Sequence, residues 1–167
     1  FAWLEETALQ ENGLYHVPTE ACQTGNIPRS ETFYPVDFNS QLALSALYMS
    51  AIGDILNDKE ISFRYKRLYF SLKTRINAHM WDDEDRFYYD LDKDGQRIKS
   101  KLLVSYWAML AEIPNDERAT YLIEQLQDPN EFGTENPFPA VPVSSPCYSE
   151  EGNGHCGGVF SVHTYMV

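Results

Sequence analysis

The sequence has few basic residues and many acidic ones. Lysine and arginine together number 13 against 25 aspartates and glutamates, giving a formal net charge of -12 and an isoelectric point near 4.6. A surface of this average sign repels a phosphate backbone, so we expect no nucleic-acid partner. No apolar run approaches the roughly 20 residues of a bilayer-spanning helix, and no basic-then-apolar leader opens the chain. We expect no membrane span, and the compartment stays open between a secreted or periplasmic location and the cytoplasm.

Cysteine is also scarce. The chain has Cys22, Cys147 and Cys156, and none of them belongs to a C-x-x-C pair. So few and scattered cysteines exclude a disulfide framework. A single bridge between Cys147 and Cys156 across the intervening loop is one option. Free thiols, a common state of buried cysteine, are the other.

Motifs for metals and cofactors are missing as well. The histidines lack the spacing of H-E-x-x-H and have no paired cysteines beside them. Residues 90–95 (D-L-D-K-D-G) open like a calcium loop, but Lys101 stands where the bidentate glutamate belongs, so we interpret this segment as a solvated turn. The glycine-rich segment 152–158 follows no predicted strand and predicts no nucleotide site. We therefore expect no metal and no cofactor.

The middle of the chain carries the periodicity of helices. Apolar residues recur at three- and four-residue steps through 35–57 and again through 60–80, and this spacing predicts one helix in each range. Asn57 and Asp58 supply the break and the N-cap chemistry between the two helices. The sequence therefore predicts an antiparallel helical hairpin.

Two further helices and a small hairpin are expected downstream. An apolar stripe predicts a helix over about 100–112, and Asn115 is placed to cap the next helix. Between the second and third helices, an aromatic run followed by Asp94-Gly95 predicts a β-hairpin near 87-98. The predicted fold class is all-α, built from antiparallel helical hairpins with this one small β-hairpin.

Irregular segments occupy residues 1–35 and a long stretch after Gln127. They combine carboxylate and amide side chains with aromatic rings. Sugar hydroxyls bond to carboxylates and amides, and the C–H faces of sugars stack on rings, so a sugar-binding surface is one interpretation. Ordinary surface loops carry the same residue types, and composition alone favours that second interpretation.

Several short motifs stand in a recognisable order. Residues 26–29 (N-I-P-R) are similar to the end of a G-x-D-N-S-P-R motif, and 35–39 (P-V-D-F-N) to a V-D-L/F-N helix opening. Residues 80–92 resemble a W-x-x-x-x-G-F-Y-Y-D hairpin, 128–132 a D-P-x-E-F turn, and 157–167 a G-G-V-W…N-Y-M-V segment. In this order the motifs resemble the trehalase and mannosyl-oligosaccharide-glucosidase-like glycoside hydrolases, a group that includes mannosylglycerate-hydrolase-like domains.

The resemblance implies an (α/α)6 toroid, in which six concentric helical hairpins place the loops of one end around the cleft. It further implies that residues 1–167 are a single partial domain of such a toroid, truncated at both ends. The remainder of its own toroid would then be its structural partner. The implied activity is inverting hydrolysis of an α-linked gluco- or manno-configured substrate, either an oligosaccharide or a small sugar.

The resemblance also assigns roles to individual residues. The family's general acid is the Asp that precedes N-S-P-R, and Gly25 stands at that position here. Glu20 and Asp37 are therefore the general-acid candidates, while the family's general base lies beyond the Y-M-V segment. The residues that the resemblance places at the substrate are Asn26, Arg29, Asn39, Trp81, Glu131, Phe132, His155 and Phe160.

Two other functions stay open. Gly25 at the position of the acid is compatible with a non-catalytic carbohydrate-binding relic of the same fold. A helical scaffold for protein partners is the third interpretation, and it ranks last because the hairpins are unequal in length and show no repeat.

Overall fold

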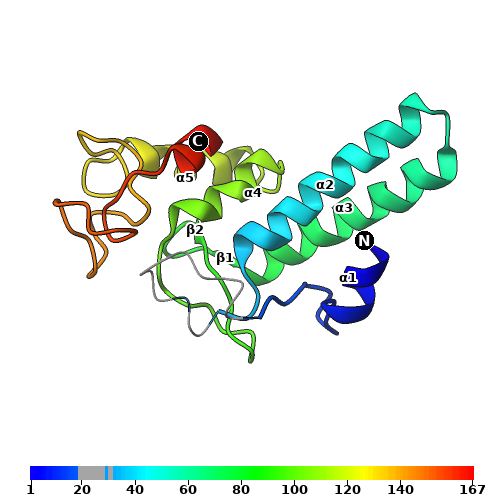
Figure 1. The fold of residues 1–167 in the computed structure, drawn as a ribbon, viewed down its shortest axis with the longest axis horizontal. Coiled ribbons are helices and arrows are strands. Elements are labelled where there is room, and N and C mark those ends of the chain that lie inside the picture. The colour runs from blue at the N-terminus through cyan, green and yellow to red at the C-terminus, as the bar shows by residue number, and fades with distance from the viewer. Residues whose placement is uncertain (19–28, 30–31) are drawn as a thin grey trace.

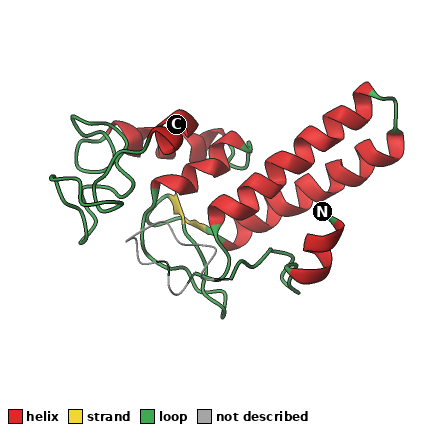
Figure 2. Cartoon of the chain, viewed as in Figure 1, coloured by secondary structure: helices red, strands yellow, loops and turns green. Residues whose placement is uncertain are grey.

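The computed structural model describes residues 1–18, 29 and 32–167 of the chain, and it is predominantly helical (Figures 1 and 2). The helices and strands, in chain order, are α1 (Ala2–Thr7), α2 (Val36–Ile55), α3 (Lys59–His79), β1 (Trp81–Asp82), β2 (Phe87–Tyr88), the 3-10 helix η2 (Leu103–Tyr106), α4 (Trp107–Leu110), α5 (Asp116–Gln127) and α6 (Ser161–Met166). Within the described part of the chain, no helix is long and apolar enough to cross a bilayer.

The long hairpin of α2 and α3 dominates the molecule (Figure 1). Both helices lie within one or two residues of the predicted ranges, so the periodicity argument is confirmed. Asp58 accepts a hydrogen bond from the backbone N–H of Ile61 at 3.0 Å and caps α3. At the tip, a Cβ on Gly53 would lie 2.6 Å from the backbone nitrogen of Ser62, so only glycine permits this approach of the two helices.

The third predicted helix is shorter than expected. The range 100–112 contains η2 and the single turn of α4, and residues 100–102 are not helical. The backbone N–H of Leu103 donates to the carbonyl of Ala140 at 2.9 Å and is therefore not available to a helix that begins at residue 100. The helical stretch begins at Leu103 instead. The predicted cap of the next helix is confirmed, because the Asn115 side chain accepts a hydrogen bond from Arg118 N–H at 2.9 Å.

The β-hairpin starts earlier than predicted. Its paired residues are Trp81 with Tyr88 and Asp82 with Phe87, in antiparallel register. The predicted turn at 94–95 is present, but it closes only an isolated bridge between Leu91 and Arg97. The Asp92 carboxylate accepts hydrogen bonds from two backbone N–H groups of this turn, those of residues 94 and 96, as the turn interpretation requires. The prediction rested on the aromatic run 87–89 and the turn at 94–95, so it placed the hairpin after Phe87. It therefore omitted the first strand, β1, which precedes that run.

The irregular segment between α5 and α6 is anchored by an aromatic cluster. Phe132 is fully buried and packs against Phe87 and Tyr106, with ring centroids 6.1 and 5.7 Å away. Further along, Val141 is also fully buried, and the backbone N–H of Ala140 donates to the carbonyl of Gly158 at 3.0 Å. The segment is therefore an ordered wall beside η2 and α6.

Candidate functional site

A buried arginine joins three parts of the chain. The guanidinium of Arg29 contacts Asp90 through Nε (2.9 Å) and Nη2 (2.8 Å), and it contacts both carboxylate oxygens of Asp37 at 2.8 and 3.3 Å. The Asp90 carboxylate also accepts hydrogen bonds from the Thr32 hydroxyl (3.2 Å) and the Val36 backbone N–H (2.8 Å). We call Arg29, Asp37 and Asp90 the Arg29 clamp. It fixes the first turn of α2 against the segment that follows the β-hairpin.

The clamp is an electrostatic unit that lies out of solvent. The side chains of Arg29 and Asp90 are each 4% exposed, and that of Asp37 is 18% exposed. Burial raises the pKa of Asp90, and the charge of Arg29 opposes that rise. Burial alone would lower the pKa of Arg29, but the neighbouring Asp90 and Asp37 hold it above its ordinary value. One cation thus balances two carboxylates, of which only Asp37 reaches the surface.

An aromatic cluster from the loop before α6 lies close to this clamp. His155 stacks on Phe160 with ring centroids 4.3 Å apart, and His163 of α6 lies 5.5 Å from Phe160. We call these three residues the His–Phe cluster. Burial lowers the pKa of His163, and so does nearby His155, while Asp37 raises it and Arg29 lowers it. His163 is therefore within electrostatic reach of the clamp.

A pocket of about 700 Å³ opens beside the His–Phe cluster, and we call it the Phe160 pocket. The residues that line it are Asn136, Pro137, Glu150, Glu151, Gly152, Gly154, Gly157, Gly158, Val159, Phe160 and Thr164. An aromatic ring, an amide and two carboxylates thus face one cavity. These are the groups that sugars need, since rings stack on their apolar faces while amides and carboxylates bond to their hydroxyls.

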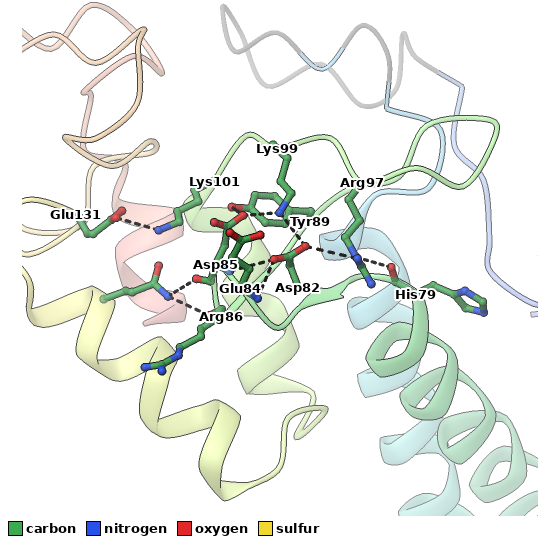
Figure 3. A network of polar contacts seen from close by, with 11 residues as sticks. His79, Asp82, Glu84, Asp85, Arg86, Tyr89, Arg97, Lys99, Lys101 and Glu131 are labelled. Carbon is green, nitrogen blue, oxygen red and sulfur yellow. Dashed lines mark hydrogen bonds and ion pairs between the residues drawn. The ribbon is translucent and has the colours of Figure 1, made fainter.

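A second polar site lies along the β-hairpin (Figure 3). Lys99 bridges Asp82 (2.7 Å) and Asp85 (2.5 Å), and Tyr89 donates its hydroxyl to Asp85 at 3.0 Å. Arg97 contacts Asp82 at 3.5 Å and also donates to the backbone carbonyl at the end of α3. Hydrogen bonding to Lys99 lowers the pKa of Asp82. These cations were not predicted from the sequence, although the alternate spacing of Arg97, Lys99 and Lys101 was a usable signal of a site beside the acidic turn 82–85.

Glu131, in the irregular segment after α5, pairs with a cation that follows the hairpin. Its carboxylate contacts Lys101 at 2.9 Å (Figure 3). It also accepts a hydrogen bond from the Ser144 hydroxyl at 3.0 Å. Adjacent Phe132 has no exposed surface and contributes its ring to the core. A pocket of about 430 Å³ lies between the hairpin and the irregular segment, and Lys99 and Lys101 line it.

Two other residues placed at the substrate by the motifs are packed inside the fold. Asn39 is fully buried and brackets Tyr15, accepting from its backbone N–H at 2.8 Å and donating to its carbonyl at 2.9 Å. Trp81 is 3% exposed, donates its indole N–H to Asp83 at 2.7 Å, and lies under the guanidinium of Arg118 at 4.7 Å. Both side chains are thus part of the packing: Asn39 fixes α2 to Tyr15, and Trp81 packs β1 against Arg118 of α5.

The structure brings together only part of the predicted set. Arg29 and Asp37 meet in the clamp, and His155 and Phe160 stack on each other in the His–Phe cluster. Glu20 and Asn26 lie outside the described residues. Among the described residues, no group of three or more His, Cys, Asp or Glu side chains is arranged to hold a metal ion.

The half-buried histidines His155 and His163 predict a pH dependence of stability. The pKa values of His155 and His163 are lowered chiefly by burial, so the unfolded chain binds protons that the folded chain rejects. The free energy of unfolding should therefore fall as the pH falls below about 6.5, the ordinary histidine value. Urea titrations should show a weaker fall in the double variant His155→Gln/His163→Gln. The exposed control His79→Gln should keep the wild-type dependence of the unfolding free energy on pH. The same dependence in the double variant would contradict the assignment.

Comparison with known proteins identifies the group to which the chain is similar. Residues 5–166 match the family described as mannosylglycerate hydrolase MGH1-like glycoside hydrolase domain. An uncharacterized protein of Borreliella burgdorferi is 45% identical over 166 residues, which cover 99% of this chain and 34% of that protein. A probable trehalase of Eremothecium gossypii is 24% identical over 127 residues, covering 74% of this chain and 17% of that protein. The chain thus spans about a third or less of these relatives.

Solved structures show the same fold. A sialidase superposes with a TM-score of 0.80 at 16% identity, covering 99% of this chain and 16% of that chain. The GH63 mannosylglycerate hydrolase from Thermus thermophilus in complex with glucose superposes with a TM-score of 0.69 at 22% identity, covering 78% and 30%. The family match over residues 5–166, together with this shared fold, confirms the resemblance that the motifs indicated.

Proposed function

Because this chain belongs to the mannosylglycerate hydrolase MGH1-like glycoside hydrolase family, we propose that it forms part of the catalytic domain of a hydrolase that cleaves α-linked gluco- or manno-configured sugars. The observation that carries the proposal is the family match over residues 5–166. The electrostatic influence of the Arg29 clamp on His163 of the His–Phe cluster supports it. The glucose held by the solved Thermus hydrolase supports the gluco- or manno-configuration.

We further propose that residues 1–167 are one partial domain of an (α/α)6 toroid. The pair α2 and α3 and the pair α4 and α5 would be two of its hairpins. Relatives about three times as long supply enough chain for the others. Large apolar side chains at the far end of the long hairpin, including Ile55 (79% exposed) and Phe63 (64% exposed), offer surface against which the remainder of the toroid can pack.

The proposed reaction is hydrolysis with inversion. A carboxylic acid protonates the leaving oxygen while a carboxylate about 6.5–9.5 Å away activates water. We assign the acid to Glu20. Asp37 is the less favoured candidate because both its oxygens already accept hydrogen bonds from Arg29, and it then positions the site. The base would come from outside residues 1–167.

Among the residues that the motifs place at the substrate, Phe160 lines a cavity and is proposed as the main contact. Phe160, with His155 stacked behind it, would form the platform for a sugar ring. Arg29 and Asn26 would stand near the reacting end of the substrate. Glu131 would act indirectly, through its ion pair with Lys101, which lines the pocket beside the hairpin. For Asn39, Trp81 and Phe132, burial supports a role in holding these walls.

A non-catalytic carbohydrate-binding protein is the second candidate. Gly25 at the position of the family's acid favours it, as does the engagement of both Asp37 oxygens. Such a protein would bind sugar at the same cavities without breaking the glycosidic bond.

The proposal is tested by following the first-formed sugar with proton NMR. The intact protein should release the β-anomer from an α-linked substrate before mutarotation mixes the anomers. Release of the α-anomer first would overturn inversion while leaving hydrolysis standing. Absence of release would favour the binding protein.

A further inference from the structure

Two cysteines meet at the base of the loop that leads to α6. Cys156 is buried and Cys147 is half-buried, and both are thiols in the structure. The side chain of Cys156 is hydrogen-bonded to that of Cys147. The Ser145 hydroxyl lies 3.5 Å from the Cys147 sulfur on its other side.

The backbone fixes this meeting. The N–H of Ser149 donates to the carbonyl of Cys156 at 3.0 Å, and the N–H of Cys156 donates to the carbonyl of Asn153 at 3.1 Å. Gly157 has a φ of 112°, and a Cβ there would lie 2.0 Å from the Ser149 carbonyl oxygen. Any other residue at 157 would push the two segments apart. The thiols therefore face each other because the two ends of the loop are closely paired.

We propose that Cys147 and Cys156 are a site of reversible disulfide formation that locks the loop 148–155 beside the Phe160 pocket. The loop contributes Glu150 and Glu151 to the pocket lining and His155 to the stack on Phe160. A covalent link at its base restricts the backbone that places these groups. The cross-link does not depend on the proposed hydrolysis.

The exposures of the two thiols set the order of the chemistry. The hydrogen bond that the Cys156 thiol donates to Cys147, together with burial, raises the pKa of Cys156 to about 11, so Cys156 stays protonated at neutral pH. The more exposed Cys147 thiolate attacks a small-molecule disulfide and forms a mixed disulfide, releasing one thiolate. Cys156 then loses its proton to that thiolate and attacks the Cys147 sulfur, which expels the second half of the small disulfide as a thiolate. This thiolate takes up the proton that Cys147 released to solvent. The protein loses two hydrogens, and the small disulfide gains them.

The experiment uses the intact protein and oxidised glutathione. After incubation, free thiols are alkylated under denaturing conditions and the non-reduced digest is mapped by mass spectrometry. We expect a linked peptide pair joining Cys147 to Cys156, two hydrogens lighter than the reduced pair. Alkylation of both residues, or a link from either one to Cys22 or another cysteine, would overturn the site.

Two further readouts separate the mechanism from the pairing. The variant Cys156→Ser should accumulate glutathione on Cys147, since the resolving thiol is gone. Cys147→Ser should leave Cys156 unmodified, and a stable adduct on Cys156 would overturn the assigned order. In the oxidised wild-type protein, amide hydrogen exchange should slow within 148–155 and stay constant in α5. Equal exchange in both redox states would overturn the proposed locking of the loop.

Discussion

Replacing Glu20 by glutamine is expected to lower kcat by about 10²- to 10⁴-fold on an α-linked disaccharide, the usual contribution of a general acid. The amide keeps the shape of the side chain but cannot protonate the leaving oxygen. Steady-state rates on purified wild type and Glu20→Gln measure the effect. Glu11→Gln, at an exposed position of the same N-terminal region, is the matched control and should retain the wild-type rate.

The leaving group distinguishes an acid from a merely structural glutamate. The leaving group of an α-glycosyl fluoride is fluoride ion, which departs with little help from a general acid. Glu20→Gln should therefore lose far less activity on this substrate than on the disaccharide. Equal losses on both substrates would show that Glu20 supports the fold or the binding of substrate. If Asp37→Asn alone gave the selective loss, the acid would be Asp37.

Replacing Arg29 by methionine is expected to lower the free energy of unfolding by about 3–5 kcal/mol at neutral pH, because it leaves the buried Asp90 without its counter-charge. Urea titration followed by circular dichroism measures the change. Arg64→Met is the control. Arg64 is 57% exposed and contacts Glu5 at 3.3 Å, so its loss should cost less than about 1 kcal/mol.

The deficit of Arg29→Met should shrink as the pH falls. Without Arg29, burial holds the pKa of Asp90 above its unfolded value of about 4, so the folded state binds a proton more readily than the unfolded state. The stability of the variant relative to wild type therefore falls as the pH rises from about 4 through the raised pKa of Asp90, and it recovers as the pH falls again. A deficit that is small, or constant between neutral and acid pH, would contradict the account of the clamp.

The sequence predicted those elements whose information is local. Helices α2 and α3 follow from apolar periodicity, and the caps at Asp58 and Asn115 follow from residue type and position. The extent of η2 and α4 could not be predicted in this way. The hydrogen bond of Leu103 to Ala140 competes with a helical start, and it links residues distant in sequence.

The candidate site was predicted in part for the same reason. Arg29 and Asp37 came from motifs, and Asp90 appeared as the last residue of the F-Y-Y-D motif and the first acid of a turn. Nothing in the sequence paired Asp90 with Arg29, which is 61 positions away. Burial likewise depends on tertiary packing. The motifs place Phe132 beside the substrate, whereas its contacts with Phe87 and Tyr106 place it in the core.

The central claim, that this chain contributes the sugar cleft of a glycoside hydrolase, is tested most directly by measuring binding and turnover on one sample. Isothermal titration of the intact protein with glucose and mannose, alongside monosaccharide release from α-glucosyl and α-mannosyl substrates, provides both quantities. We expect saturable binding together with release, and weaker binding in Phe160→Ala. Binding without release would assign the chain to a non-catalytic sugar-binding protein. The absence of both binding and release would contradict the claim.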